Sequence, residues 1–140
     1  MPTNTTYNPP NMMSFVKTAL NFDARGFSTI VTAGTTSHID FTLTDDMLIT
    51  GAWVVTNNGN YGDTASLQVI DTNGTFTGVP GTVLNTFMTN WYLPPQTSEQ
   101  FDIAYPAKIF AGLTLRIIYT STGSNNVFVA INYKLHRVLI

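Results

Sequence analysis

The segment GLTLRIIYTSTGSNNVFVAINYKLHRVLI (residues 112–140) carries the clearest structural signal in the chain. Apolar side chains occupy every second position in two runs, from 113 to 119 and from 127 to 135. A period of two places alternate side chains on opposite faces of a β-strand, so each run predicts a strand with one buried face. The residues between the runs, STGSNN, favour a turn. The pattern therefore predicts two strands that pair as a hairpin.

Similar short runs rich in β-branched and aromatic residues precede this segment. Residues 14–22 fit either a strand or a single helical turn. Pro106 lies inside one run and cannot donate a hydrogen bond to a sheet, so it predicts an edge strand, a bulge or a break there. The predicted strands are 27–33, 38–43, 47–57, 65–71, 82–93 and 100–110, followed by the two C-terminal runs.

Seven or eight short strands without a convincing helix predict an all-β fold, a single-domain antiparallel β-sandwich that is jelly-roll-like. The turn-rich loop at 72–81 favours a jelly roll, because in that topology connections cross between the sheets. An immunoglobulin-type sandwich is the alternative, although its marker disulfide is missing because the chain has no cysteine. A chain of 140 residues is normally one domain and can bury an adequate core without disulfides.

Residues 1–13 predict an extended N-terminal arm in front of a β-sandwich domain that comprises residues 14–140. The arm has no charged side chain and no apolar period, and its Pro-Pro pair favours polyproline geometry. Such a segment cannot build its own core, so we expect it to lie on a neighbouring subunit. The chain also ends on apolar residues, which would form an adhesive patch if exposed. The expected interface residues are Tyr7, Pro9, Pro10, Leu139 and Ile140.

The composition excludes several classes of function. The net charge is −2 and the six cations are scattered, which argues against nucleic acid and against anionic membranes as partners. The absence of cysteine excludes thiol catalysis and cysteine-bound zinc. No signal peptide and no apolar run of spanning length is present, so we expect synthesis in a cytoplasm. Only 10% of residues are charged, which suggests a surface of Thr and Asn that could pack against other protein.

No arrangement of residues in the sequence predicts an enzyme, a metal site or a bound cofactor. His38 and His136 both occupy polar positions of alternating strands, and two isolated histidines do not make a catalytic triad. A hydrolase built from His38, Asp40 and Glu99 has no support from their spacing. Most other carboxylates lie in turn settings, where the Asp side chain bonds the local backbone. The carboxylates assigned to turns are Asp45, Asp46, Asp63 and Asp71.

The aromatic residues leave three interpretations open: core, subunit interface or a platform for sugar rings. Tryptophan and tyrosine dominate protein interfaces. Aromatic faces beside Asn and Asp are also typical of carbohydrate sites. A glycan- or receptor-binding module is therefore the alternative to a structural role. The residues proposed for glycan contact are Trp53, Trp91 and Tyr92, with Tyr7, Tyr61 and Tyr105 as further aromatic candidates.

Short predicted strands alternate regularly with turns in two segments of the chain. These segments are GTTSHIDFTLTDDMLITGAWVV (34–55) and FDIAYPAKIFAGLTLRIIYTSTGSNNVFVAINYKLHRVL (101–139). In this alternation of strands and turns the chain resembles small structural proteins encoded by tailed bacteriophages. The resemblance covers roughly residues 34–139 and includes no diagnostic motif. It implies a non-enzymatic virion protein that acts in capsid decoration, head–tail connection or the tail. The implied partners are other copies of the chain and other virion proteins, in a particle assembled inside the host cytoplasm.

Overall fold

A computed structural model describes residues 22–137, and every regular element in this range is a β-strand. The arm at 1–13, the segment 14–21 and the last three residues lie outside the described range, and with them all five expected interface residues. The strands are β1 (Phe22–Val31), β2 (Thr36–Thr42), β3 (Met47–Thr56), β4 (Thr64–Asp71), β5 (Thr82–Tyr92), β6 (Ser98–Ile109), β7 (Thr114–Thr120) and β8 (Val127–Arg137).

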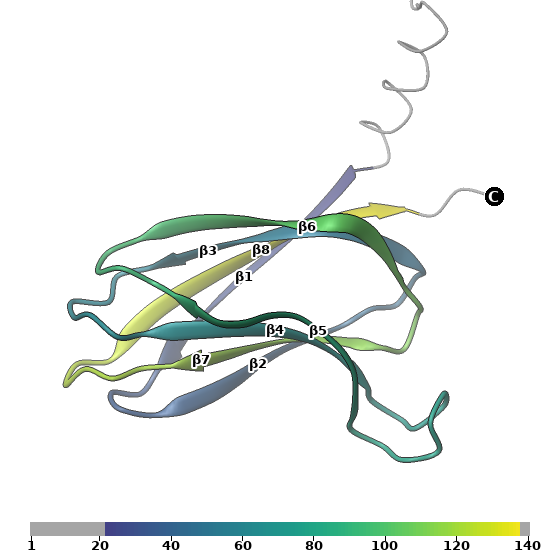
Figure 1. Cartoon of the computed structure of the whole chain (residues 1–140), viewed down its shortest axis with the longest axis horizontal. Coiled ribbons are helices and arrows are strands. Elements are labelled where there is room, and N and C mark those ends of the chain that lie inside the picture. Colours follow the sequence, from purple (N-terminus) through teal and green to yellow (C-terminus); the bar gives the residue numbers. More distant parts are fainter. Residues whose placement is uncertain (1–21, 138–140) are drawn as a thin grey trace, which may run out of the picture.

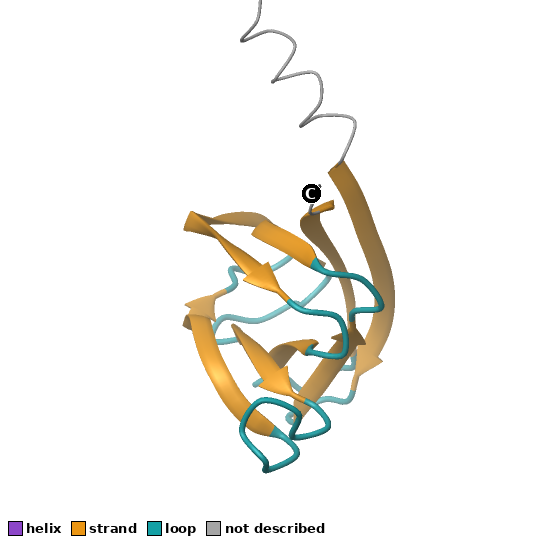
Figure 2. Cartoon of the chain, turned by 90° about the vertical axis from the view of Figure 1, so that its right-hand side faces the viewer, coloured by secondary structure: helices purple, strands orange, loops and turns teal. Residues whose placement is uncertain are grey.

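The eight strands form two antiparallel sheets of four strands each (Figure 1). Sheet A has the order β1-β8-β3-β6, and sheet B has the order β2-β7-β4-β5. Figure 2 shows the sheets facing each other as the two layers of a sandwich. Nearly all successive strands alternate between the sheets, which is the eight-stranded jelly-roll arrangement. The predicted fold class is confirmed, and this strand order excludes the immunoglobulin-type alternative.

The predicted C-terminal hairpin is wrong, although the two strands and their buried faces are right. β7 belongs to sheet B, where it pairs with β2 and β4, whereas β8 belongs to sheet A, where it pairs with β1 and β3. The alternating apolar residues of both strands are buried, so they meet across the sandwich instead of lying side by side. Alternation determines which face of a strand is apolar, but it does not determine the neighbouring strand.

The interpretation of the loop at 72–81 is also wrong. This loop joins β4 to β5, which are paired neighbours within sheet B. Among the eight described strands, this is the only consecutive pair that shares a sheet. The connections that cross the sandwich are shorter, because crossing requires only the roughly 10 Å between packed sheets. Loop length therefore did not indicate where the chain changes sheets.

The core lies between the sheets and is made almost entirely of the inward-facing alternate residues. Two tyrosines, Tyr119 and Tyr133, are fully buried within it, and the ring of Tyr133 stacks on Phe41 at 6.0 Å. β6 is an edge strand of sheet A, as Pro106 predicted. It also bulges there, since residues 103–106 lie between two consecutive pairing positions with β3.

Gly51 permits β3 to pass close to its neighbour at this irregularity. A Cβ atom built on Gly51 would lie 2.5 Å from the backbone oxygen of Phe101, which cannot move without disturbing the strand. The substitution Gly51→Ala is therefore expected to lower the free energy of unfolding by about 2 kcal/mol. Urea denaturation measures this effect. Gly59→Ala is the matched control, because its Cβ would meet nothing within 4 Å, and its stability should change by less than about 0.5 kcal/mol.

Candidate interaction surfaces

The outward side of sheet A carries an exposed apolar surface, here called the apolar face. The registers place Ile30 beside Phe128 and Val55 beside Ala130, with Trp53 in the next row of β3. The side chains of Trp53 and Val55 are 44% and 38% exposed. The indole Nε1 of Trp53 donates to Ser98 Oγ at 2.7 Å, which holds the ring against the sheet. The apolar face consists of Ile30, Trp53, Val55, Phe128 and Ala130.

The central strands of sheet B carry polar groups on their outward side, whereas the edge strand β5 exposes Val83, Leu84 and Tyr92. Arg116 forms a two-pronged ion pair with Asp40, with Nε and Nη2 at 2.8 and 3.0 Å from the two carboxylate oxygens. This pairing raises the pKa of Arg116. Gln68 and Thr86 continue the same row across β4 and β5. The centre of sheet B is therefore polar with an ion pair on its outward side, whereas the outward side of sheet A carries the apolar face.

The three residues proposed for glycan contact lie on different surfaces. Trp53 belongs to the apolar face on sheet A. Trp91 lies on the edge strand β5 with its ring 5.7 Å from that of Phe101, which belongs to sheet A, so Trp91 covers the core between the two sheet edges. Tyr92 follows it and points to the opposite side of β5. The structure does not bring these rings together as one platform.

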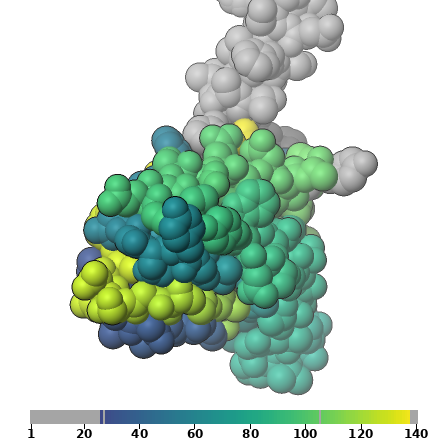
Figure 3. All heavy atoms as spheres, turned by 60° about the vertical axis from the view of Figure 1, so that its left-hand side comes forward, coloured from purple at the N-terminus to yellow at the C-terminus, as the bar shows by residue number. Residues whose placement is uncertain are grey.

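The loop at 72–81 stands out from one end of the molecule (Figure 3). Asp71 organises it, because its Oδ2 accepts the N–H groups of Phe76 and Thr77 at 3.1 and 2.8 Å and the hydroxyl of Thr77 at 2.8 Å. Burial raises the pKa of Asp71, but these hydrogen bonds more than offset it and hold the pKa below its usual value. The loop presents Phe76 and Val79 to solvent, and Phe76 stacks on Phe110 at 5.4 Å.

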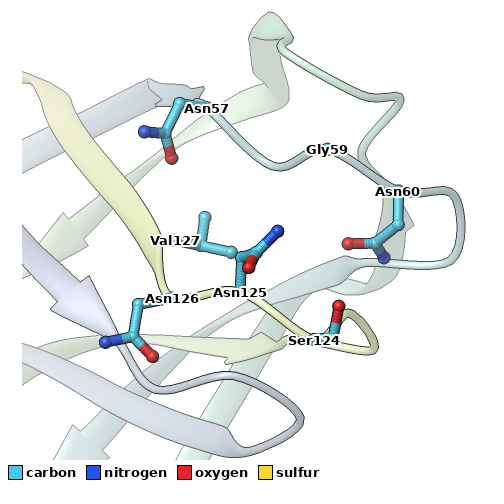
Figure 4. Close-up of a pocket in the computed structure, with 7 residues that line it drawn as sticks. All are labelled: Asn57, Gly59, Asn60, Ser124, Asn125, Asn126 and Val127. Carbon is cyan, nitrogen blue, oxygen red and sulfur yellow. The ribbon is translucent and has the colours of Figure 1, made fainter.

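A small polar pocket lies at the opposite end, between the β3–β4 and β7–β8 connections. It has a volume of about 170 Å³. Amide and hydroxyl groups form most of its wall, and no charged side chain lines it. Figure 4 shows its residues, which are Asn57, Gly59, Asn60, Ser124, Asn125, Asn126 and Val127.

The buried carboxylate of Asp63 joins the two connections that form this pocket. Its Oδ1 accepts the Thr122 N–H at 2.9 Å and Asn60 Nδ2 at 3.0 Å, and its Oδ2 accepts the Tyr119 hydroxyl at 2.7 Å. The backbone oxygen of Asp63 also accepts the N–H of Leu93 at the end of β5. The sequence identified Asp63 only as a turn residue, because nothing in the local pattern signals that it is buried.

These contacts shift the ionisation of both partners. Burial alone raises the pKa of Asp63, but the hydrogen bonds from Thr122, Tyr119 and Asn60 outweigh it and lower the pKa below its usual value. Burial, together with the neighbouring carboxylate, raises the pKa of Tyr119. Asp63 is therefore a carboxylate and Tyr119 a neutral phenol at neutral pH, which is the arrangement that a charge-assisted hydrogen bond requires.

The residues considered for catalysis are not brought together. His38 and Asp40 lie on the outer side of sheet B, whereas Glu99 lies on β6 and His136 on β8, both in sheet A. Asp40 is bound to Arg116. In the part of the chain that the structure describes, no three His, Cys, Asp or Glu side chains cluster as metal ligands would. The described residues also contain no helix that is long and apolar enough to cross a membrane.

No known family model and no curated protein matches the chain. Solved structures with a similar fold include the T13 particle of IBDV, at a TM-score of 0.45 and 10% identity over 83% of this chain and 31% of that one. The Gt strain of infectious bursal disease virus aligns at 0.40 and 15% identity, over 81% and 30%. The VP2 subviral particle of the same virus aligns at 0.36 and 13% identity, over 84% and 35%. The chain spans about a third of the length of these proteins.

The Asp63 network predicts a specific response to pH. Asp63→Asn should lower the free energy of unfolding at pH 7 by about 2 kcal/mol, because it removes a charge from a site built to receive one. Since the folded-state pKa lies below the usual value of about 3.9, the contribution of the carboxylate is complete above about pH 5 and is lost as the pH falls toward the folded-state pKa. The stability difference between wild type and variant should therefore shrink on acidification.

Urea titrations of the two proteins between pH 7 and pH 2.5 measure this difference. The control is Asp45→Asn, at an exposed position, which should change stability by less than about 0.5 kcal/mol at every pH. A difference between wild type and Asp63→Asn that is independent of pH would contradict the assignment of Asp63 as a buried carboxylate.

Proposed function

We propose that this protein is a non-enzymatic structural component of a virus particle and that it works by burying surface against other subunits. The observation that carries the proposal is the apolar face on the outside of sheet A. Jelly rolls host viral capsid proteins as well as unrelated functions, so the fold by itself does not decide between them. The chemistry of the outer surfaces is therefore the stronger evidence about function.

The apolar face has the composition of an interface. Large exposed apolar side chains that lie together on a rigid sheet mark sites of protein association. A tryptophan at the centre of such a patch is the residue type that most often dominates binding energy. Trp53 lies on β3, two residues from Val55, and pairs with Gln100 on β6 and with Asn132 on β8. Its hydrogen bond to Ser98 reduces the side-chain entropy that association would cost.

Charges at the rim of the apolar face suit contact with a second copy. Lys134 Nζ lies 3.0 Å from Asp102 Oδ1, so one cation and one anion sit together at this edge of the surface. A two-fold axis that passes beside this pair would bring the Lys134 of one copy near the Asp102 of another. Closed symmetry of this kind is the commonest arrangement of soluble oligomers. A stable contact would bury more than about 1,000 Å² in total.

The finer assignment is to a tailed bacteriophage, with a role in capsid decoration or head–tail assembly. It draws on the resemblance of residues 34–139 to small structural proteins of such phages. The arm at 1–13 and the C-terminal residues would add contacts with neighbouring subunits or other virion proteins, through Tyr7, Pro9, Pro10, Leu139 and Ile140. Neither a cofactor nor nucleic acid nor a membrane takes part in this function, and the particle would be assembled in the host cytoplasm.

A pair of lysine substitutions tests the role of the apolar face. Val55→Lys should convert a defined oligomer of the full chain to monomer, because it places a charge within the buried surface. Thr86→Lys is the matched control, since it introduces the same charge at an exposed position of a strand in sheet B. The control should retain the mass of wild type. Native mass spectrometry and light scattering measure the masses, and circular dichroism shows that both variants fold.

Two results would overturn the proposal. A wild-type chain that is monomeric at all accessible concentrations would remove the self-association that the apolar face is proposed to drive. Loss of the oligomer in Thr86→Lys but not in Val55→Lys would place the subunit contact on sheet B instead.

A further inference from the structure

The pocket at the end opposite the loop 72–81 has no part in the proposed assembly function. Its two walls come from the β3–β4 and β7–β8 connections, which lie next to each other in Figure 3. Figure 4 shows Asn60, Ser124 and Asn125 with their polar atoms directed into the space between the connections. Asn57 and Asn126 line the side nearer the strands, and their amides are turned away from the centre.

Hydrogen bonds to its amide nitrogen fix the orientation of the Asn60 side chain. Its Nδ2 donates to Asp63 Oδ1 at 3.0 Å, to Thr122 Oγ1 at 2.8 Å and to the backbone oxygen of Tyr61 at 3.2 Å. All three partners are acceptors or can act as such, so the amide nitrogen must face them and Oδ1 must face the pocket. Gly123 makes room for this oxygen, because a Cβ there would lie 2.0 Å from Asn60 Oδ1.

Two further asparagines bind the pocket walls to β8 and to the β1–β2 connection. Asn57 Oδ1 accepts the N–H of Phe128 at 2.7 Å, and Asn126 Oδ1 accepts the N–H of Ala33 at 3.0 Å. These bonds fix both connections before any ligand arrives. A pocket that is ordered in advance loses less conformational entropy when it binds.

We propose that this pocket binds a single neutral sugar ring, with Asn60, Ser124 and Asn125 as the contacting side chains. Asn60 offers an acceptor, Ser124 offers a hydroxyl that both donates and accepts, and Asn125 offers an amide with both functions. Neighbouring sugar hydroxyls also donate and accept, so they match this set. No charged side chain lines the pocket, which disfavours phosphates, carboxylates and metal ions as ligands.

The size of the pocket agrees with this class of ligand. A single water needs about 10–15 Å³ of such space, so about 170 Å³ holds far more than one water. Pockets for drug-sized ligands and cofactors typically measure about 300–1,000 Å³, so this smaller pocket suits a ligand no larger than a single ring. Tyr61 follows Asn60 in the chain and is 78% exposed, so most of its ring is accessible to a ligand from solvent.

Nuclear magnetic resonance titration of the full chain tests the proposal. The probes are glucose, galactose, mannose, N-acetylglucosamine and N-acetylgalactosamine, each added up to 50 mM. At least one should shift the amide signals of Asn60, Tyr61 and Asn125 in a saturable way. Ser124→Ala combined with Asn125→Ala should weaken that binding by about tenfold or more, through the loss of two hydrogen-bonding side chains.

The control is Asn73→Ala, which removes an exposed asparagine from the loop at the other end of the sandwich and should bind like wild type. The absence of saturable shifts with all five sugars would overturn the proposal. So would shifts centred on Trp53 or Trp91 that survive the double substitution. Repeating the titration on Val55→Lys separates this inference from the assembly function, because a monomer should still bind the sugar.

Discussion

The buried carboxylate of Asp63 is the interaction on which one end of this jelly roll depends. A charge without solvent contact is tolerated only when it is saturated with hydrogen bonds. Asp63 meets this demand with donors from the β3–β4 connection, from β7 and from the β7–β8 connection. These segments are far apart in the chain, so the carboxylate fixes where they lie relative to one another. It therefore contributes to the position of Asn60 and to the geometry of the pocket.

Asp71 organises the structure at the other end of the sandwich, but through hydrogen bonds to residues close to it in the chain. Its carboxylate accepts donors from residues 75 to 77 of the adjoining loop, so it shapes one loop without joining distant segments. The result is a stiff projection with exposed Phe76 and Val79 at its tip. Both aspartates have a lowered pKa for the same reason, since their hydrogen bonds outweigh the effect of burial. Acidification therefore weakens both ends of the sandwich together.

The candidate interaction surfaces lie on different parts of the sandwich. The apolar face covers the outside of sheet A, the polar pocket lies at one end, and the projecting loop lies at the other (Figure 1). An oligomer formed through the apolar face would leave both ends accessible. A subunit could then be held in an assembly by its sheet while it presents a binding pocket outward. The rigid jelly roll makes this division possible, because strand pairing fixes the separation of the surfaces.

Much of the candidate site could not be predicted from the sequence. The aromatic residues Trp53, Trp91 and Tyr92 were grouped by chemistry, but the registers distribute them over three surfaces. Asn60, Ser124 and Asn125 were read as parts of turns, because a turn and a pocket wall have the same composition. Only the approach of two connections about 60 residues apart turns these asparagines into a pocket. Asp63 was recognised as a turn residue, and its burial follows from contacts with Tyr119 and Thr122.

The sequence by itself determined the strands and the face that each one buries, because side chains alternate along any β-strand whatever its neighbours are. The alternate apolar residues within 113–119 and 127–135 were assigned to the core on this basis, and they are there. Pro106 likewise marked an edge strand, since a missing N–H is a local property. Strand partners, the placement of β7 and β8 in opposite sheets, and the apolar face were decided only by the tertiary structure. Pairing depends on contacts between distant residues, and a period of two is the same in a hairpin as in two facing sheets.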